Sequence, residues 1–355
     1  MGDDLLKETL QLRTPRLLAS GVDYNDIQAV LGRLKRFEDW CAEWAAMAEV
    51  HERLGDEALR AGRPLTAGEA FVRAAVYYHT GQSVSFEDPA EKRRIQERQR
   101  DAYVKAMPHL RPPARQLEVP FEGIAFTGNL RVPAGAPTPP CVLLNPGADS
   151  TKEEFYTLEQ EFLRRGVATF SYDGPGQGLT RRHMKLRPDW EKPVGAVIDA
   201  LASRPEIDGS RLGIWGRSFG GYAAPRAACF ERRLRACISI GGFYDLQAIW
   251  DRLPVSVKDT LAFGFGLESH AAARSRAADF TLAGLLDNLT CPFLIIHSGR
   301  DTVCPVEESE RIRAEAGGPT SLVIFPEGNH VCDNIPYKVR PLMADWMAAQ
   351  LGASG

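Results

Sequence analysis

The sequence has no long apolar run, no paired cysteine motif and no large excess of one charge. No stretch approaches the roughly 20 apolar residues that a membrane-spanning helix requires. The seven cysteines form no Cys-x-x-Cys pair and no cluster with histidines, so we expect reduced thiols rather than disulfides or a zinc site. The start of the chain carries no secretory signal pattern. We therefore expect a cytoplasmic protein that does not bind a membrane.

The charge pattern also argues against a nucleic-acid partner. Lysine and arginine number 43 against 46 aspartates and glutamates, which gives a net charge of −3. The basic residues at 92–94 and 98–100 alternate with acidic and apolar residues, and this predicts a solvated helix face rather than a basic patch.

Two patterns of hydrophobicity divide the chain. Up to about residue 113, apolar residues recur at helical spacing among good helix formers. The sequence Leu-Arg-Pro-Pro at 110–113 then interrupts the pattern. We expect an N-terminal helical cap domain over residues 1–115 and a catalytic domain over residues 116–355.

Short strand-like runs follow, and after the third of them they alternate with helical stretches. Such alternation predicts an α/β fold with a mainly parallel sheet of eight strands and helices on both faces. Residues 244–288 are helix-like and lie between two of these strands, where a helical lid would be inserted. The predicted strands are 117–120, 124–132, 141–144, 167–172, 212–215, 236–240, 293–297 and 322–325.

The motif Gly216-x-Ser218-x-Gly220 has the form of a nucleophile elbow. The apolar run 212–215 precedes it and the alanine-rich stretch 221–224 follows it, as expected for a sharp turn between a strand and a helix. Glycines on both sides keep side chains out of the crowded turn. The context favours Ser218 as a nucleophile over a simple helix-capping serine.

An acid and a histidine follow Ser218 in the order that this kind of site uses. Asp301 ends the turn after the predicted strand 293–297, and His330 lies in the loop after the last predicted strand, 322–325. We predict that His330 accepts the serine proton and that Asp301 orients the imidazole. His297 inside a strand is expected to be a hydrogen-bonded core residue, and Asp173 to fix a turn.

The tetrahedral intermediate requires preorganised N–H donors. One is expected to be the backbone N–H of Phe219, and the other should come from the loop after strand 141–144. Pro146 has no N–H. Ala148, or alternatively Gly147, is therefore predicted as the second donor.

With these residues in view, the chain resembles the 2,6-dihydropseudooxynicotine hydrolase family of α/β-hydrolases, and it is similar to the fungal yellowish-green polyketide-shortening hydrolases. The helical domain ahead of the core supports the resemblance. So do the motifs NPGADSTKEE at 145–154, DGPGQG at 173–178, GRSFGG at 216–221 and GGFYDL at 241–246.

The resemblance implies hydrolysis of a carbon–carbon bond next to a ketone, a substrate held between cap and core, no metal or organic cofactor, and a homodimer. It also implies that Ser218, Asp301 and His330 form the triad. The family has an extra glutamate after Gly-Gly-Phe, but residues 245–252 contain none, and Asp245 or Asp251 are the acids that could replace it.

The sequence thus predicts a serine hydrolase acting on a β-dicarbonyl or polyketide-like small molecule. A carboxylesterase or lactonase acting on a small-molecule ester would use the same triad, as would a natural-product cyclase or acyl-transfer enzyme. A non-catalytic receptor on the same fold is the alternative from another class.

Overall fold

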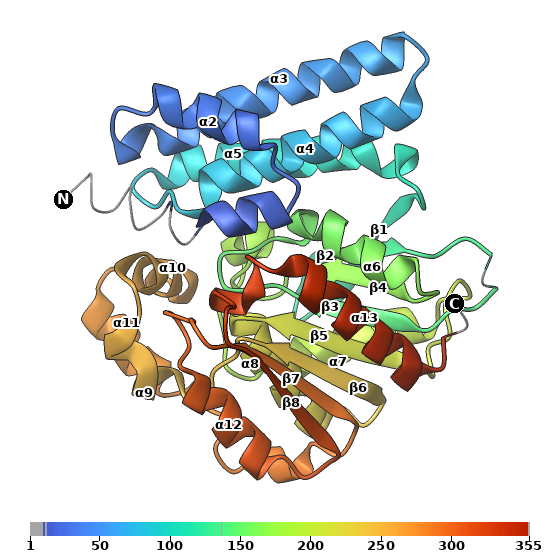
Figure 1. The fold of residues 1–355 in the computed structure, drawn as a ribbon, viewed down its shortest axis with the longest axis vertical. Coiled ribbons are helices and arrows are strands. Elements are labelled where there is room, and N and C mark those ends of the chain that lie inside the picture. Colours follow the sequence, from blue (N-terminus) through green and yellow to red (C-terminus); the bar gives the residue numbers. More distant parts are fainter. Residues whose placement is uncertain (1–9, 11–12, 136, 354–355) are drawn as a thin grey trace.

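The computed structural model describes residues 10, 13–135 and 137–353 (Figure 1). A layer of long helices from the first third of the chain covers one end of a twisted sheet, which carries helices on both faces (Figure 1). The outer residues of the predicted domain ranges, 1–9 and 354–355, lie outside the described residues.

The first third is helical, as predicted. After a helical segment at residues 13–19, the longer helices are α2 (Tyr24–Arg33), α3 (Trp40–Arg60), α4 (Pro64–Ser83) and α5 (Pro89–Ala106). Helix α4 is buried along most of its length because it lies between α3 and α5 and also contacts the sheet domain. At the start of α5, Asp88 accepts hydrogen bonds from the backbone N–H groups of Ala90 and Glu91, which caps the helix.

These helices build an apolar core of their own, which extends from Leu17 to Ala114 and includes Trp44 and Phe71. The prediction of a solvated helix face at residues 92–94 and 98–100 is wrong at Lys92 and Gln99, each only 2 % exposed. The backbone carbonyl of Gln82 accepts a hydrogen bond from Lys92, and burial strongly lowers the pKa of this amine.

The sheet contains eight strands, as predicted, in the order β1-β2-β4-β3-β5-β6-β7-β8. The two N-terminal strands are antiparallel to each other, and β2 is antiparallel to β4, whereas all later neighbours pair in parallel. The strands are β1 (Ala114–Phe121), β2 (Ile124–Arg131), β3 (Cys141–Asn145), β4 (Ala168–Tyr172), β5 (Leu212–Arg217), β6 (Leu234–Ile240), β7 (Phe293–Ser298) and β8 (Thr320–Phe325).

Helices cover both faces of the sheet, which buries β3 to β6 completely or nearly so. One face packs against α6 (Tyr156–Leu163) and α13 (Pro336–Leu351). The other face packs against α7 (Glu191–Ala202), α8 (Phe219–Phe230) and α12 (Val306–Glu315).

The helix-like stretch between β6 and β7 is helical in the structure. It contains α9 (Leu246–Ile249), α10 (Val255–Phe265) and α11 (His270–Ala277), and α10 lies beside the cap (Figure 1). Phe263 of α10 contacts Phe86 of the cap with ring centroids 5.3 Å apart. The short 3₁₀ turns are η1 (Phe37–Asp39), η2 (Met107–His109), η3 (Lys152–Phe155), η4 (Gly178–Arg182), η5 (Trp250–Arg252), η6 (Leu286–Asn288) and η7 (His330–Cys332).

Membrane-spanning helices and disulfides were not expected in the described part of the chain. None of the helices there is long and apolar enough to cross a membrane. All seven cysteines lie in described ranges and none is bonded to another, as predicted for reduced thiols.

Candidate active site

Ser218 lies at the turn between β5 and α8, with backbone angles of φ 54° and ψ −119°. This left-handed region is strained for a residue with a side chain. The flanking glycines are required because a Cβ at Gly216 would overlap the backbone of Gly220, and a Cβ at Gly220 would overlap the carbonyl of Asn145. The local sequence therefore folds into the sharp elbow that the motif predicted.

The structure brings the three predicted residues together at the carboxyl ends of the strands. The Ser218 Oγ atom lies 3.0 Å from His330 Nε2. The other ring nitrogen, His330 Nδ1, lies 2.9 Å from Asp301 Oδ2 and 3.0 Å from Oδ1. A neutral imidazole in this position can donate from Nδ1 to the carboxylate and accept from the serine hydroxyl.

Asp301 is held in its ionised form by several partners. Burial raises the pKa of this carboxyl group, but the neighbouring His330 and His297 and hydrogen bonds lower it below its ordinary value. Its Oδ1 atom accepts from the backbone N–H groups of Val303 (2.8 Å) and Cys304 (2.9 Å). The acid is thus fixed before any substrate binds.

His297 is the core histidine that the sequence suggested. It is fully buried, and burial lowers its pKa. Its Nε2 atom lies 3.0 Å from the carbonyl oxygen of Cys304, in the loop that also contains Asp301.

The loop after β3 lies against the elbow, where the second oxyanion donor was predicted. A Cβ on Gly147 would be 3.6 Å from the Cβ of Ser218. Among the residues that the structure describes, neither the N–H of Ala148 nor that of Phe219 donates to a protein acceptor. Both groups are therefore available to a ligand beside Ser218.

Three side chains hold this loop by its carbonyl and amide groups. The Gln177 Nε2 atom donates to the carbonyl oxygens of Pro146 (2.9 Å) and Gly147 (3.1 Å). Arg181 donates to the carbonyl oxygen of Ala148 at 3.1 Å. Trp190 donates to the side-chain oxygen of Asn145 at 3.0 Å.

These contacts fix the carbonyl groups of the loop beside Ser218. Sequence reasoning had noted the motif at 173–178 without finding this role for Gln177. Asp173 in the same motif is structural, but its side chain holds η3 rather than its own turn, since it accepts hydrogen bonds from the backbone and the amine of Lys152.

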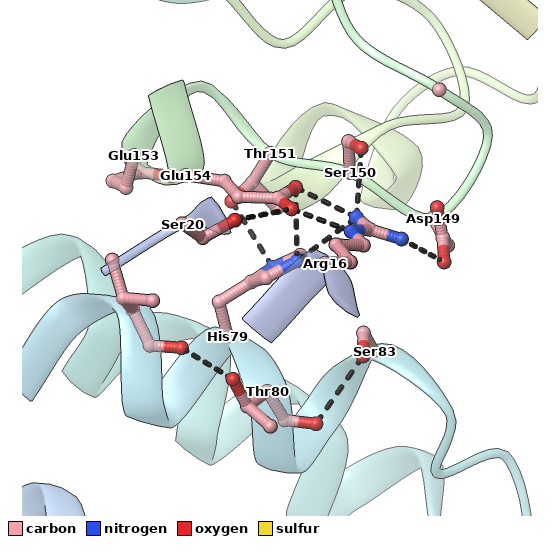
Figure 2. A network of polar contacts seen from close by, with 12 residues as sticks. Arg16, Ser20, His79, Thr80, Ser83, Asp149, Ser150, Thr151, Glu153 and Glu154 are labelled. Atoms are coloured by element: carbon pink, nitrogen blue, oxygen red, sulfur yellow. Dashed lines mark hydrogen bonds and ion pairs between the residues drawn. The ribbon is translucent and has the colours of Figure 1, made fainter. Parts of the chain in front are cut away.

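A buried polar network joins the cap to residues 149–154, which follow β3 (Figure 2). Arg16, in the helical segment 13–19, points at Glu154 and Asp149, with contacts of 2.5 Å and 2.7 Å to Glu154 and 2.8 Å to Asp149. Arg217, between Gly216 and Ser218, donates to the same Glu154 at 2.7 Å. His79 of α4 lies 3.2 Å from Glu154.

The charges of this network depend on one another. Burial would raise the pKa of Glu154, but Arg16 and Arg217 hold it well below its ordinary value. Burial would also raise the pKa of Asp149, but Arg13 and Arg16 lower it below its ordinary value. Sequence reasoning missed Arg13, Arg16 and Glu154 as parts of the site, because no local pattern connects residues 13–16 with residues 149–154.

Ser218 and His330 line a cavity of about 90 Å³. The cavity lies between the core, α10 and the cap segment, which is the helical segment 13–19. Ligand pockets in proteins are typically about 300–1,000 Å³, so this cavity is small. A larger hollow of about 460 Å³ lies on the other side of α10 and contains none of the three residues. Thr260 of α10 lines the small cavity and Phe263 lines the large one, so this helix separates the two.

Neither candidate for the missing glutamate lies on the small cavity. Asp245 caps α9 by accepting from the N–H of Ala248, and Asp251 forms an exposed ion pair with Arg274. The structure thus places both acids in local roles away from Ser218. No cluster of metal-ligating side chains occurs among the described residues.

The sheet order and the elbow at Ser218 define an α/β-hydrolase fold, and Ser218, His330 and Asp301 lie, in that order, within hydrogen-bonding distance of one another. Residues 11–346 match the family described as Esterase FrsA-like. The chain belongs to this family and is an enzyme of the α/β-hydrolase class.

Relatives with curated names agree with this assignment. The chain is 33 % identical over 341 residues to the 2,6-dihydropseudooxynicotine hydrolase of Paenarthrobacter nicotinovorans, covering 96 % of this chain and 92 % of that protein. It is 32 % identical to the alpha/beta hydrolase pydG of an Acremonium species, over 83 % of each chain. It is 37 % identical to the hydrolyase poxO of Penicillium oxalicum, but it covers only 53 % of that protein.

Solved structures show the same fold. The crystal structure of the 2,6-dihydroxy-pseudo-oxynicotine hydrolase superimposes with a TM-score of 0.89, at 32 % identity and over 96 % of both chains. The structure of AbyA5 superimposes with a TM-score of 0.79 over 99 % of this chain and 95 % of that one, and at 21 % identity it supports the fold alone. The family resemblance predicted from the sequence is confirmed.

Proposed function

We propose that this enzyme is a serine hydrolase that cleaves a carbon–carbon bond next to a ketone in a β-dicarbonyl or polyketide-like small molecule. The observation that carries the proposal is the 3.0 Å contact between Ser218 Oγ and His330 Nε2, with Asp301 on the opposite ring nitrogen. Serine becomes an effective nucleophile only when a base accepts its proton.

In the proposed reaction, Ser218 attacks the ketone carbon while His330 takes the hydroxyl proton. The carbon–carbon bond then breaks, and its electron pair leaves with a carbanion that the neighbouring carbonyl stabilises as an enolate. His330 returns its proton to that carbanion. Water, activated by the same histidine, hydrolyses the acyl-enzyme and releases a carboxylic acid.

Ala148 and Phe219 are the proposed oxyanion donors, with Gly147 as the alternative to Ala148. The free N–H groups beside Ser218 support this assignment. Donors already fixed in place stabilise the developing charge without reorganising, which makes such groups effective in catalysis. The proposed chemistry uses no metal or organic cofactor.

Carboxylic ester hydrolysis is the second candidate function. The family name includes esterase, and ester and ketone substrates pass through the same tetrahedral intermediate. The similarity over nearly the whole chain to 2,6-dihydropseudooxynicotine hydrolase favours the carbon–carbon reaction.

A comparison of two substrates separates these functions. We expect the purified protein to convert a β-diketone to a ketone and a carboxylic acid, measured by mass spectrometry of the products. Ser218→Ala should lower this turnover by roughly 10³-fold or more while the protein remains folded. Turnover of an aryl ester with no turnover of any β-diketone would overturn the carbon–carbon assignment.

The site also suggests how the larger parts of the molecule take part. We propose that residues 1–115 act as a cap domain on the catalytic domain 116–355, and that the inserted helices of residues 244–288 act as a lid. Because the cavity at Ser218 is small, α10 would move to admit a polyketide-like substrate. A cytoplasmic homodimer is the proposed form of the enzyme, and light scattering would test the oligomeric state.

A further inference from the structure

We propose that Arg13 recognises an anionic oxygen on the leaving-group side of the substrate, and so selects substrates that carry or develop such a charge. This inference rests on the proposed function. It assigns to the cap segment a specificity-determining residue whose role goes beyond the triad.

Arg13 belongs to the same cavity as the nucleophile. Its side chain is only 11 % exposed and lines the cavity of about 90 Å³ together with Ser218 and His330. Three guanidinium groups and two carboxylates line this cavity, and Glu154 directly behind them pairs with Arg16 and Arg217. Arg13 shares the carboxylate of Asp149 with Arg16, so an anion that entered the cavity would be attracted to the Arg13 guanidinium group.

Within residues 10, 13–135 and 137–353, Arg13 uses little of its hydrogen-bonding capacity. A guanidinium group has five N–H donors, and the described residues give Arg13 one acceptor, Asp149. Asp149 is itself shared with Arg16, which contacts it at 2.8 Å. Burial lowers the pKa of Arg13, as expected for a charge that is removed from water and only partly compensated.

The position of Asp149 places Arg13 beside the loop after β3, residues 146–149, called the oxyanion loop because it contains the proposed donors Ala148 and Gly147. Asp149 directly follows Ala148, whose N–H is a proposed donor to the carbonyl oxygen under attack. Arg13 reaches this point from the cap, whereas the oxyanion donors belong to the core. A substrate whose scissile carbonyl binds the core donors would therefore direct its other half toward the cap and Arg13.

This placement suits the carbon–carbon reaction. When the bond between the acyl carbon and the neighbouring carbon breaks, the electron pair delocalises onto the oxygen of the second carbonyl. That oxygen becomes an enolate until His330 protonates the carbon. A guanidinium donor stabilises such an oxygen by a charge-assisted hydrogen bond, and it would equally bind a carboxylate that the substrate already carries.

Replacing Arg13 does not leave the buried carboxylate of Asp149 unpaired, because Asp149 still has Arg16 as a partner. We would measure kcat and KM for Arg13→Gln and Arg13→Lys on a neutral β-diketone, on a β-diketone with a terminal carboxylate, and on a neutral aryl ester. Arg36→Gln is the matched control, since Arg36 is a cap arginine that is 69 % exposed. Thermal unfolding verifies that each variant is folded.

We expect Arg13→Gln to lower kcat on the neutral β-diketone on the order of 10- to 100-fold, the typical effect of losing a hydrogen bond to a charged group. If the recognised charge is a carboxylate already on the substrate, KM for the carboxylate-bearing compound should rise instead. In both cases Arg13→Lys should restore part of the loss, and the aryl ester should be hydrolysed as by the wild type.

Equal losses on all three substrates would overturn the proposal, because they would indicate a structural role for Arg13. Unchanged kinetics on every substrate in a folded Arg13→Gln protein would also overturn it. Failure of the proposed function can be distinguished from failure of the Arg13 proposal. If the proposed function fails, the wild type hydrolyses only esters. In that case the same variants are compared on neutral and carboxylate-bearing aryl esters.

Discussion

Gly220 has no space for a side chain, because a Cβ there would overlap the carbonyl oxygen of Asn145 in the loop after β3. Gly220→Ala should separate this loop from the elbow and lower kcat at least 10²-fold, the cost of losing an oxyanion donor. The matched control is Gly195→Ala in α7, where the nearest atom would be 3.9 Å away. That change should stabilise the protein by about 1 kcal/mol, and steady-state kinetics with thermal unfolding would measure both effects. Normal activity in a folded Gly220→Ala protein would contradict this account of the elbow.

Among individual residues, the sequence predicted those whose chemistry has a local signature. Ser218 has glycines on both sides, and Asp301 and His330 each follow a predicted strand, so their meeting point could be inferred from the topology of a parallel sheet. Arg13 and Arg16 carry no such signature. Their acidic partners lie more than 130 residues away, and contacts of that kind depend on how the cap packs on the core.

Among the structural elements, the segment between β4 and α7 acts on the site through Gln177. This side chain is fully buried, and its amide nitrogen holds two consecutive carbonyl groups of the oxyanion loop. Gln177→Met should leave the loop free to turn its N–H groups away from Ser218. We expect kcat to fall about 10- to 100-fold with little change in KM, because the lost interaction acts on the transition state.

The control for Gln177→Met is Gln28→Met on the exposed surface of α2. A boronic acid that mimics the tetrahedral intermediate gives a second measurement, and its affinity for Gln177→Met should fall in parallel with kcat. A higher KM with unchanged kcat would mean that Gln177 affects substrate binding rather than the oxyanion loop.

Most of the secondary-structure prediction rested on the apolar patterns of the strands. The apolar runs are short, rich in branched residues and bounded by turn residues, and all eight strands were found near the predicted positions. Polar burial was harder to predict. Lys92 and Gln99 lie on a helix with alternating charges, and their burial results from the packing of α5 against the core and α10, which sequence patterns do not encode.

For the molecule as a whole, Glu154 is the carboxylate that ties the cap to the elbow. Glu154→Gln should leave Arg16 and Arg217 without their shared charge, and breaking a buried pair costs about 3–5 kcal/mol. Since the pKa of Glu154 in the folded state lies well below its ordinary value of 4.5, its contribution is complete above that value and is lost as the pH falls below it.

Thermal unfolding between pH 3 and pH 8 would measure this dependence. The difference in stability between wild type and Glu154→Gln should be constant near neutral pH and should narrow below about pH 4.5. Glu43→Gln is the control, because Glu43 pairs with Arg33 on the surface and should change stability by about 0–1 kcal/mol. A difference that did not vary with pH would indicate that the amide disturbs packing rather than charge.

Arg16 and Glu154 are 138 residues apart in the sequence. The parts of the site are therefore synthesised at different times. The ribosome delivers the cap, with its own apolar core, before the third strand of the sheet exists. Ser218 follows, and His330 is added 112 residues later. Translation thus produces the helical cap first and His330 last, so a nascent chain holds Ser218 without its histidine partner until the final strand has been made.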